Sequence, residues 1–441
     1  MQLNKKNSLA LNISQKDKIF LLLIFLNWMM YENLVLLEPM YFGGAILLAF
    51  VFMYKLLFPF VLVFSYGLPP IKFMLNARVF FYLSFFLLLV CWSVIPSLLY
   101  GDVVSWFKII PLFIFFFGVL SFFYLNPECF LLFIKILVVY VLIALIQYCL
   151  INIFKTYESS RPHSMDLVGP FGLFGNTASK IGFPDNGGVM YIVRLTGFWK
   201  EPSNAAGSAF AAFFLTKYLQ VFDNSKKWKY ASNLCLIAGF LTLSNAGYLS
   251  ISIAFLFGFM LRTKTRKWKL QVLIVTPILI LLIWFALFSR TYFADQGIDS
   301  NVLKAVTGIR NQDVNDVNYD PTSGRLDLMN DAINQTAKNI IGRGLQVTGE
   351  ATGVVAPASA PMFWLFLTGI PGLLFLLLRE ASLFAFIPET LKSEKSTLFL
   401  IQALIAVMIQ QAIYGTWMDP NYLILSAVVL LPLSNRKLLG V

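Results

Sequence analysis

Long apolar runs separated by short polar segments occur along most of the chain. About 20 consecutive apolar residues are needed for an α-helix to cross a bilayer. Twelve stretches reach or approach that length: 19–37, 40–66, 79–100, 105–125, 129–152, 203–222, 230–245, 247–262, 269–289, 361–378, 397–415 and 420–434. A tight turn at Asn245-Ala246-Gly247 is expected to separate 230–245 from 247–262. The pattern predicts an all-α polytopic integral membrane protein with about twelve transmembrane helices in a single transmembrane domain, residues 1–441.

The composition agrees with this pattern. Hydrophobic residues make up 58% of the chain and charged residues only 13%, and the mean hydropathy is +0.74. An average soluble domain is about a quarter charged, so soluble enzymes and disordered scaffolds are excluded. No expected cytoplasmic segment exceeds about twenty residues and no phosphate-binding loop motif is present, which argues against direct use of ATP.

The distribution of basic residues predicts the orientation in the membrane. A net charge of +12 is typical of nucleic-acid binders, but here the cations follow the sides of a bilayer. With both termini inside, nineteen of them fall on the cytoplasmic side: Lys5, Lys6, Lys16, Lys18, Lys72, Arg78, Lys226, Lys227, Lys229, Arg262, Lys264, Arg266, Lys267, Lys269, Arg379, Lys392, Lys395, Arg436 and Lys437. The positive-inside rule therefore predicts an N-in and C-in topology.

Two long loops then lie on the outer face, at 153–201 and 290–360. Together they hold eleven Lys and Arg against twelve Asp and Glu. Because these loops are nearly neutral, we expect no nucleic-acid partner. The candidate chemistry lies within them.

The first outer loop ends in the sequence R-L-T-G-F-W-K-E-P-S over residues 194–203. Pro202 suits the first turn of the following helix, which puts Glu201 at the positive end of the helix dipole. A helix cap would explain Glu201 by itself, but it would not explain the neighbouring Arg194 and Lys200. Two interpretations of Glu201 therefore stay open, a cap and a functional carboxylate.

The second outer loop contains an S-G-R triplet that ends at Arg325. After it, apolar residues recur at steps of three and four: Leu326, Met329, Ile333, Ala337 and Ile340. With Asp327 and Asp331 early, Lys338 late and Gly342 as a stop, this pattern predicts an amphipathic helix on the membrane surface. The helix dipole disfavours a structural cation in the first turn, so Arg325 is expected either to serve a bound anion or to pair with a loop aspartate.

Other candidate sites have little support. His163 is the only histidine, which excludes a multi-histidine metal site. The spacing of Asp313, Asp316 and Asp320 does not match an EF-hand loop. We therefore expect no metal site and no cofactor.

The two outer-loop motifs resemble those of a known family. The element at 194–203 is similar to the R-x-x-G-x-x-x-E-P-S element of the bacterial O-antigen polymerases and O-antigen ligases. The S-G-R triplet, the helix after it and G-R-G-L at 342–345 resemble the S-G-R to G-x-G segment in the large outer loop of that family. The resemblance implies a metal- and nucleotide-independent glycosyltransferase in the bacterial inner membrane, with its active site on the periplasmic face. The implied substrates are an undecaprenyl-diphosphate-linked oligosaccharide donor and acceptor, and a chain-length regulator is a further candidate partner.

The implied chemistry gives the charged residues their roles. The donor leaves as a diphosphate, so the site must hold two phosphates and stabilise developing negative charge. Arg194 and Arg325 are the leading ligands because the guanidinium fork binds phosphate oxygens bidentately, and Arg343 and Lys200 are helpers. Glu201 is the first candidate for the base that deprotonates the acceptor hydroxyl.

This role of Glu201 has an alternative. A helix terminus and a nearby arginine both favour the ionised carboxylate and weaken it as a base, so Glu201 could instead orient Arg194. Asp327 and Asp331 are then the second choices for the base.

Three functions are compatible with the resemblance and the predicted topology. In ligases of the family, a histidine proposed as the catalytic base lies on the segment that enters the span after the large loop. Here residues 356–362 read A-P-A-S-A-P-M, which favours a repeat-unit polymerase. A ligase that transfers the polymer to a lipid A core is the first alternative, and a lipid-linked sugar flippase or transporter is the second.

Overall fold

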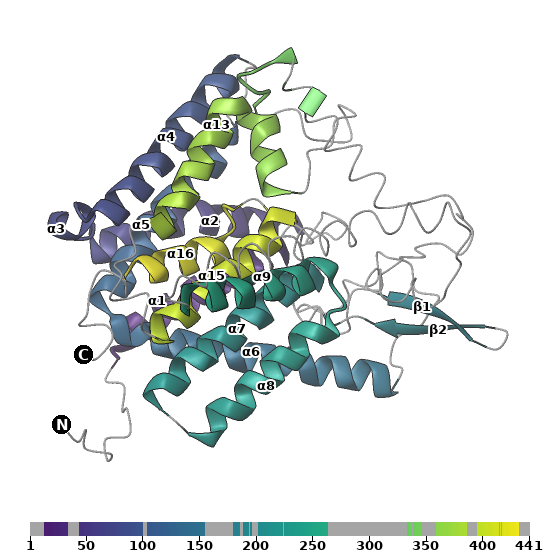
Figure 1. The fold of residues 1–441 in the computed structure, drawn as a ribbon. Coiled ribbons are helices and arrows are strands. Elements are labelled where there is room, and N and C mark those ends of the chain that lie inside the picture. Colours follow the sequence, from purple (N-terminus) through teal and green to yellow (C-terminus); the bar gives the residue numbers. More distant parts are fainter. Residues whose placement is uncertain are drawn as a thin grey trace.

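The computed structural model is an assembly of helices with one β-hairpin (Figure 1). It describes residues 13–33, 44–99, 104–154, 180–185, 188–193, 195, 202–223, 225–262, 333–334, 336, 338–344, 359–385, 395–413, 415 and 417–431. The helices are α1 (Gln15–Asn33), α2 (Gly44–Tyr66), α3 (Ile71–Met74), α4 (Ala77–Leu99), α5 (Val104–Leu125), α6 (Pro127–Phe154), α7 (Pro202–Phe222), α8 (Lys226–Leu241), α9 (Asn245–Arg262), α13 (Ala360–Ala385), α15 (Lys395–Ile413) and α16 (Pro420–Leu430).

Eleven of the twelve expected spans have a helical counterpart, and the twelfth, 269–289, lies outside the described residues. Within the described part of the chain, four helices are long and apolar enough to cross a membrane: Ala77–Leu99, Pro127–Leu150, Ala360–Phe384 and Ser396–Ile413. These helices confirm an α-helical membrane protein. The count of twelve spans and the N-in, C-in topology stay predictions.

The first outer loop departs from the all-α prediction. It contains an antiparallel hairpin of β1 (Lys180–Asp185) and β2 (Gly188–Val193), in which Asp185 pairs with Gly188. The two residues between the strands are Asn186 and Gly187, a dipeptide that favours a two-residue hairpin connection.

The connection between α8 and α9 also differs from its prediction. Helix α8 ends at Leu241 and α9 already begins at Asn245, so the turn lies at 242–244 and not at Asn245-Ala246-Gly247. Leu243 has a φ of 48° in this turn. Gly247 instead serves close packing, because a Cβ atom built there would lie 2.5 Å from the Cβ of Ala206 on α7.

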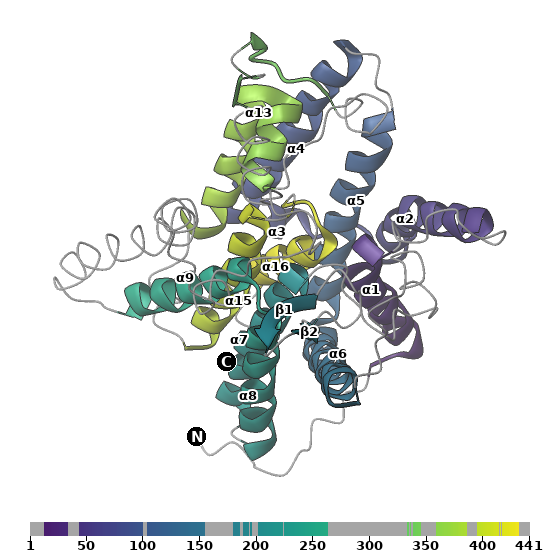
Figure 2. The ribbon, with the colours of Figure 1, turned by 90° about the vertical axis from the view of Figure 1, so that its right-hand side faces the viewer.

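Helix α7 lies at the centre of the larger helical group and packs against α6, α8, α9 and α15. Its first turns carry five small residues, all of them buried: Ala205, Ala206, Gly207, Ser208 and Ala209. Such a small-residue face lets neighbouring helices approach closely. Helix α13 packs mainly against α4, and the two run together in both views (Figures 1 and 2).

Candidate functional site

The structure describes one of the five predicted site residues, Arg343. The other four lie outside the described residues: Arg194, Lys200, Glu201 and Arg325. The same holds for the second-choice bases Asp327 and Asp331 and for His163. What the structure does describe is how the chain is anchored on either side of the two motifs.

The first motif is anchored at both of its ends. Strand β2 ends at Val193, and the Leu195 backbone N–H donates to the carbonyl of Leu241 at the end of α8, at 3.1 Å. Leu195 itself is buried, with 1% exposure. Helix α7 begins at Pro202, which confirms the predicted helix start, because proline is preorganised for the first helical position.

Asn204, in the first turn of α7, connects this anchor to α15. Its Oδ1 accepts a hydrogen bond of 2.7 Å from Nε2 of Gln410, and both side chains are buried. Gln410 also lies against Gly207, where an added Cβ would come within 2.9 Å of Oε1. The start of α7 is therefore held by a buried amide pair three positions after Glu201 in the sequence.

The second motif ends in a turn that is packed against α13. Residues 333, 334, 336 and 338 are helical, in agreement with the predicted amphipathic helix, whose earlier part lies outside the described residues. The helix stops before Gly342, because Asn339 starts a turn in which its Nδ2 donates to the Gly342 carbonyl at 2.9 Å. The last described helical residue is 338, so the helix ends before the predicted stop at Gly342, which has a φ of 91° and lies in the following turn.

Helix α13 is broken where this turn meets it. Gly369 has φ 67° and ψ −164°, and Pro371 follows two residues later. Such a break leaves carbonyls of the preceding turn without their helical partners. In a membrane protein these groups must find other donors.

Four consecutive carbonyls before the break accept hydrogen bonds from outside α13. The Leu365 carbonyl accepts from the Thr336 hydroxyl at 3.3 Å, and the Thr368 carbonyl accepts from the Trp92 indole of α4 at 2.8 Å. Between them, the backbone N–H groups of Arg343 and Gly344 donate to the carbonyls of Phe366 and Leu367 at 3.1 and 2.9 Å. After the break, the Ile370 N–H donates to the Ile340 carbonyl at 3.0 Å.

This backbone pairing requires glycine on both sides. A Cβ at Gly369 would lie 1.9 Å from the Ile340 carbonyl oxygen, and a Cβ at Gly342 would lie 2.4 Å from the Gly369 nitrogen. Both residues also have a positive φ. The G-x-G element therefore lets the end of the loop that precedes α13 lie directly on the broken helix, and it fixes the backbone of Arg343 there. The Arg343 side chain is partly exposed.

The described parts of the two motifs are not brought together. In Figures 1 and 2 the loop segment on α13 lies at the top, in green, while the hairpin that precedes the first motif lies well below it. A shared site for Arg194, Glu201, Arg325 and Arg343 thus stays a prediction.

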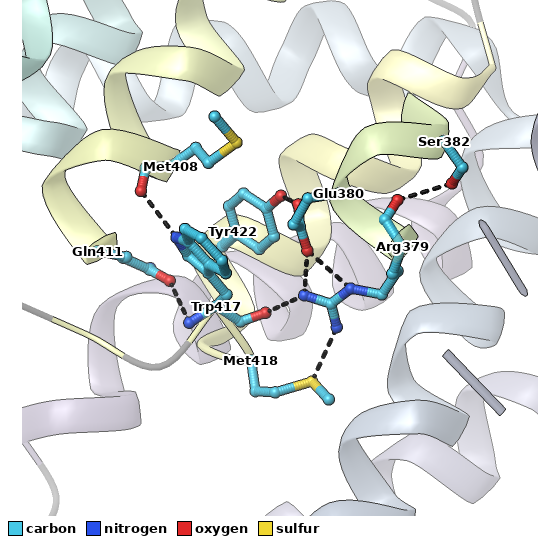
Figure 3. Close-up of polar contacts among 8 residues, drawn as sticks. All are labelled: Arg379, Glu380, Ser382, Met408, Gln411, Trp417, Met418 and Tyr422. Atoms are coloured by element: carbon cyan, nitrogen blue, oxygen red, sulfur yellow. Dashed lines mark hydrogen bonds and ion pairs between the residues drawn. The ribbon is translucent and has the colours of Figure 1, made fainter. Parts of the chain in front are cut away.

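A second polar cluster was missed from the sequence (Figure 3). Arg379 and Glu380 on α13 form an ion pair with side-chain exposures of 0% and 7%. The second oxygen of Glu380 accepts a hydrogen bond from the hydroxyl of Tyr422. The other donors of Arg379 reach the Trp417 carbonyl at 2.8 Å and the Met418 sulfur at 3.2 Å.

The structure corrects the loop placement of two cations, Arg379 and Arg78, while their side of the membrane stays a prediction. Arg379 was placed in a cytoplasmic loop because the apolar run ends at 378, but α13 continues to Ala385 and encloses the residue. Arg78 was also counted as a loop cation, yet it is 3% exposed and donates to the Leu383 carbonyl at 2.6 Å. An arginine beside an apolar run looks the same in sequence whether it faces water or a neighbouring helix.

Comparison with known protein families finds a match in the part of the chain that runs from α8 into α13. Residues 230–377 match the family model described as O-antigen ligase. This segment is similar to the O-antigen ligase family. This family covers O-antigen polymerases as well as ligases, and the match confirms the resemblance inferred from the motifs. No curated protein matches the chain.

The O-antigen ligase family domain spans the turn, the break and the pairing between them. It runs from α8 through the second outer loop into α13, so it includes the S-G-R triplet, Arg343 and Gly369. The motif at 194–203 precedes the matched segment, and Glu380 follows it. The family domain implies a glycosyltransferase-like enzyme of surface glycan assembly acting on lipid-linked sugars in a membrane.

Proposed function

We propose that the protein is a polymerase of lipid-linked oligosaccharide repeat units, acting at the periplasmic face of the bacterial inner membrane. It moves a growing glycan from one undecaprenyl diphosphate onto a new repeat unit that is itself linked to undecaprenyl diphosphate. The observation that carries this proposal is the O-antigen ligase family domain at 230–377, which contains the S-G-R and G-x-G elements. The α-helical membrane architecture supports it.

The proposed reaction is a glycosyl transfer without metal or nucleotide. A hydroxyl of the acceptor sugar attacks the anomeric carbon of the donor, a new glycosidic bond forms, and the bond to the diphosphate oxygen breaks. Glu201 takes the hydroxyl proton, and Arg194 and Arg325 bind the leaving diphosphate, with Lys200 and Arg343 supporting them. The docking of Gly344 and Arg343 on α13 supports the last assignment, since it holds the Arg343 backbone in one place.

A ligase remains the first alternative within the same family domain. It would use the same donor and the same leaving group, but its acceptor would be a lipid A core. The sequence A-P-A-S-A-P-M at 356–362, which has no histidine, favours polymerisation.

A lipid-linked sugar transporter is favoured by two observations that the sequence did not reveal. Transporters contain discontinuous helices and intramembrane charges, and α13 contains both a break at Gly369 and the buried Arg379–Glu380 pair. However, protein donors occupy the four carbonyls at the break, and the charges pair with each other. These groups are therefore already bonded within the protein and do not form a binding site for a transported substrate or ion. The polymerase is the better-supported function.

Deletion of the gene, followed by gel analysis of surface glycan and of lipid-linked intermediates, tests the proposal. A polymerase predicts products with a single repeat and loss of the polymer ladder. Free polymer that accumulates on its lipid carrier would instead indicate a ligase, and repeat units that accumulate on the cytoplasmic side would indicate a flippase.

A further inference from the structure

The connection between α15 and α16 contains a strained residue. Trp417 has a φ of 55°, a conformation that bulky residues rarely adopt, and Gly415 before it has a φ of 156°. Trp417 is nevertheless buried, with 6% exposure. Such strain persists only where the surroundings hold it, and it occurs preferentially at functional sites.

Buried polar groups hold Trp417 from two sides (Figure 3). Its N–H donates to Oε1 of Gln411 at 3.1 Å, and its indole donates to the Met408 carbonyl at 2.8 Å, both on α15. Its carbonyl accepts from Arg379 of α13 at 2.8 Å. The guanidinium of Arg379 is itself buried and lies 4.9 Å from the ring centre of Phe86 on α4.

The same turn of α15 is connected to the start of α7. Gln411 holds Trp417 and also donates to Oδ1 of Asn421 at 2.7 Å. Its neighbour Gln410 donates to Asn204, the third residue of α7. A continuous set of buried contacts thus runs from the ion pair on α13, through the Trp417 turn and the end of α15, to the helix that begins after Glu201.

The cost of this arrangement argues against a purely stabilising role. A buried ion pair pays a large desolvation penalty, and well-packed apolar residues of similar volume often serve stability equally well or better. Charges inside a membrane protein are correspondingly rare and are associated with function. The Arg379–Glu380 pair is therefore better explained by the backbone geometry that it imposes on the strained Trp417 turn than by a contribution to stability.

We propose that the Arg379–Glu380 pair and Gln410 are positioning residues, which hold the Trp417 turn and the end of α15 so that the start of α7 is fixed for catalysis. This inference rests on the proposed polymerase function and on Glu201 as part of its site. The pair does not touch the substrate. It acts through Trp417, Gln410 and Asn204.

The test is a double variant, Arg379→Met with Glu380→Leu, which removes both charges and leaves neither one unpaired. Membrane levels should stay normal, because no isolated charge is buried. Elongation of lipid-linked repeat units by membranes should lose about 10²-fold in kcat, the loss expected when catalytic groups are misplaced by about 1 Å, with little change in KM. A double variant with the kcat of the unmodified protein would overturn the inference.

A second test exchanges the two amide side chains. Gln410→Asn alone shortens one partner and should lower kcat. Adding Asn204→Gln lengthens the other partner by the same amount, which restores the hydrogen bond and should restore kcat. Gln402→Leu is the matched control, because Gln402 is a buried glutamine on α15 that instead donates to the Ala254 carbonyl of α9 at 3.0 Å. Its kcat should not change. If the exchanged pair is no more active than Gln410→Asn, or if Gln402→Leu lowers kcat equally, the pathway through Asn204 is wrong.

These outcomes separate the two proposals. Membranes with the unmodified protein that elongate no lipid-linked repeat would refute the polymerase function itself. Membranes that elongate normally in both the unmodified protein and the double variant would refute only the positioning role.

Discussion

Gly369 provides the most direct test of the contact between the outer loop and α13. Gly369→Ala adds one methyl group at a position where it would lie 1.9 Å from the Ile340 carbonyl oxygen and 2.7 Å from the Gly342 nitrogen. Both neighbours are backbone atoms, so a side-chain rotation cannot relieve the contact. The loop segment must move away from the break, or α13 must change its backbone.

The magnitude follows from the bonds that the segment makes. Alanine at φ 67° and ψ −164° costs about 1 to 3 kcal/mol of backbone strain. Separation also removes the bonds from Arg343 to Phe366, from Gly344 to Leu367 and from Ile370 to Ile340, which together contribute about 1.5 to 4.5 kcal/mol. The bonds hold the segment on α13, whereas the strain and the 1.9 Å contact with the Ile340 carbonyl oxygen raise the free energy of this docked state. The contact is too short to be tolerated, so the released state, which the bonds disfavour by about 1.5 to 4.5 kcal/mol in the unmodified protein, becomes populated without unfolding of the surrounding helices.

Limited proteolysis of the purified protein in detergent measures this release. Trypsin cleaves after Arg343, whose following residue Gly344 is buried against α4 and bonded to the Leu367 carbonyl. In Gly369→Ala, cleavage at this bond should accelerate on the order of 100-fold or more, because each 1.4 kcal/mol changes the open population about tenfold.

Gly67→Ala is the matched control for the backbone term. Gly67 has a φ of 71°, close to that of Gly369, but a Cβ there would have no atom within 4 Å. It should cost about 1 to 2 kcal/mol and leave cleavage after Arg343 unchanged. Equal cleavage rates in the two variants would refute the packing of the loop on the broken helix.

Four further substitutions test separate contacts and roles. Trp92→Phe removes the indole donor to the break in α13, so it should destabilise the protein by about 1 kcal/mol in detergent unfolding and speed the same tryptic cleavage. Gly247→Ala should cost about 1 to 3 kcal/mol by overpacking against α7, and Ala206→Gly in the same chain should recover much of it. Arg325→Ala should abolish the glycan ladder at normal membrane levels, with poor rescue by Arg325→Lys; a normal ladder would exclude Arg325 from diphosphate binding. Glu201→Gln keeps a capping oxygen but no basic carboxylate, so retained activity would show that Glu201 is a cap.

The sequence predicted the helices well because their signal is simple. A run of about 20 apolar residues in a membrane protein has few alternatives to a helix, and the start of α7 at Pro202 followed from the preference of proline for the first helical turn. The helix ends were less accurate. The apolar run before Arg379 ended at 378, whereas α13 extends to Ala385 because Arg379 and Glu380 satisfy each other inside the bundle.

The features that were missed depend on contacts between distant segments. Gly369 and Pro371 lie in an apolar run that reads as one span. The break is stabilised by donors from distant segments, which are Trp92 of α4 and Thr336, Arg343 and Gly344 of the preceding loop. The pairing of Gln410 with Asn204 likewise joins residues 206 positions apart. For the candidate site, the sequence supplied the residue types, and only the Arg343 backbone is placed by the described structure.

The contact between the loop and α13 has a consequence for how the sequence of this segment can vary. Apart from its two glycines, the segment 340–344 is bound through main-chain atoms, and the side chains of Ile340 and Ile341 are exposed. Main-chain contacts are the same for almost any amino acid, so positions 340 and 341 can change without releasing the segment. Gly342 and Gly369 thus hold the end of the loop on α13 whatever side chains stand at positions 340 and 341, and a change there should leave the backbone of Arg343 in place.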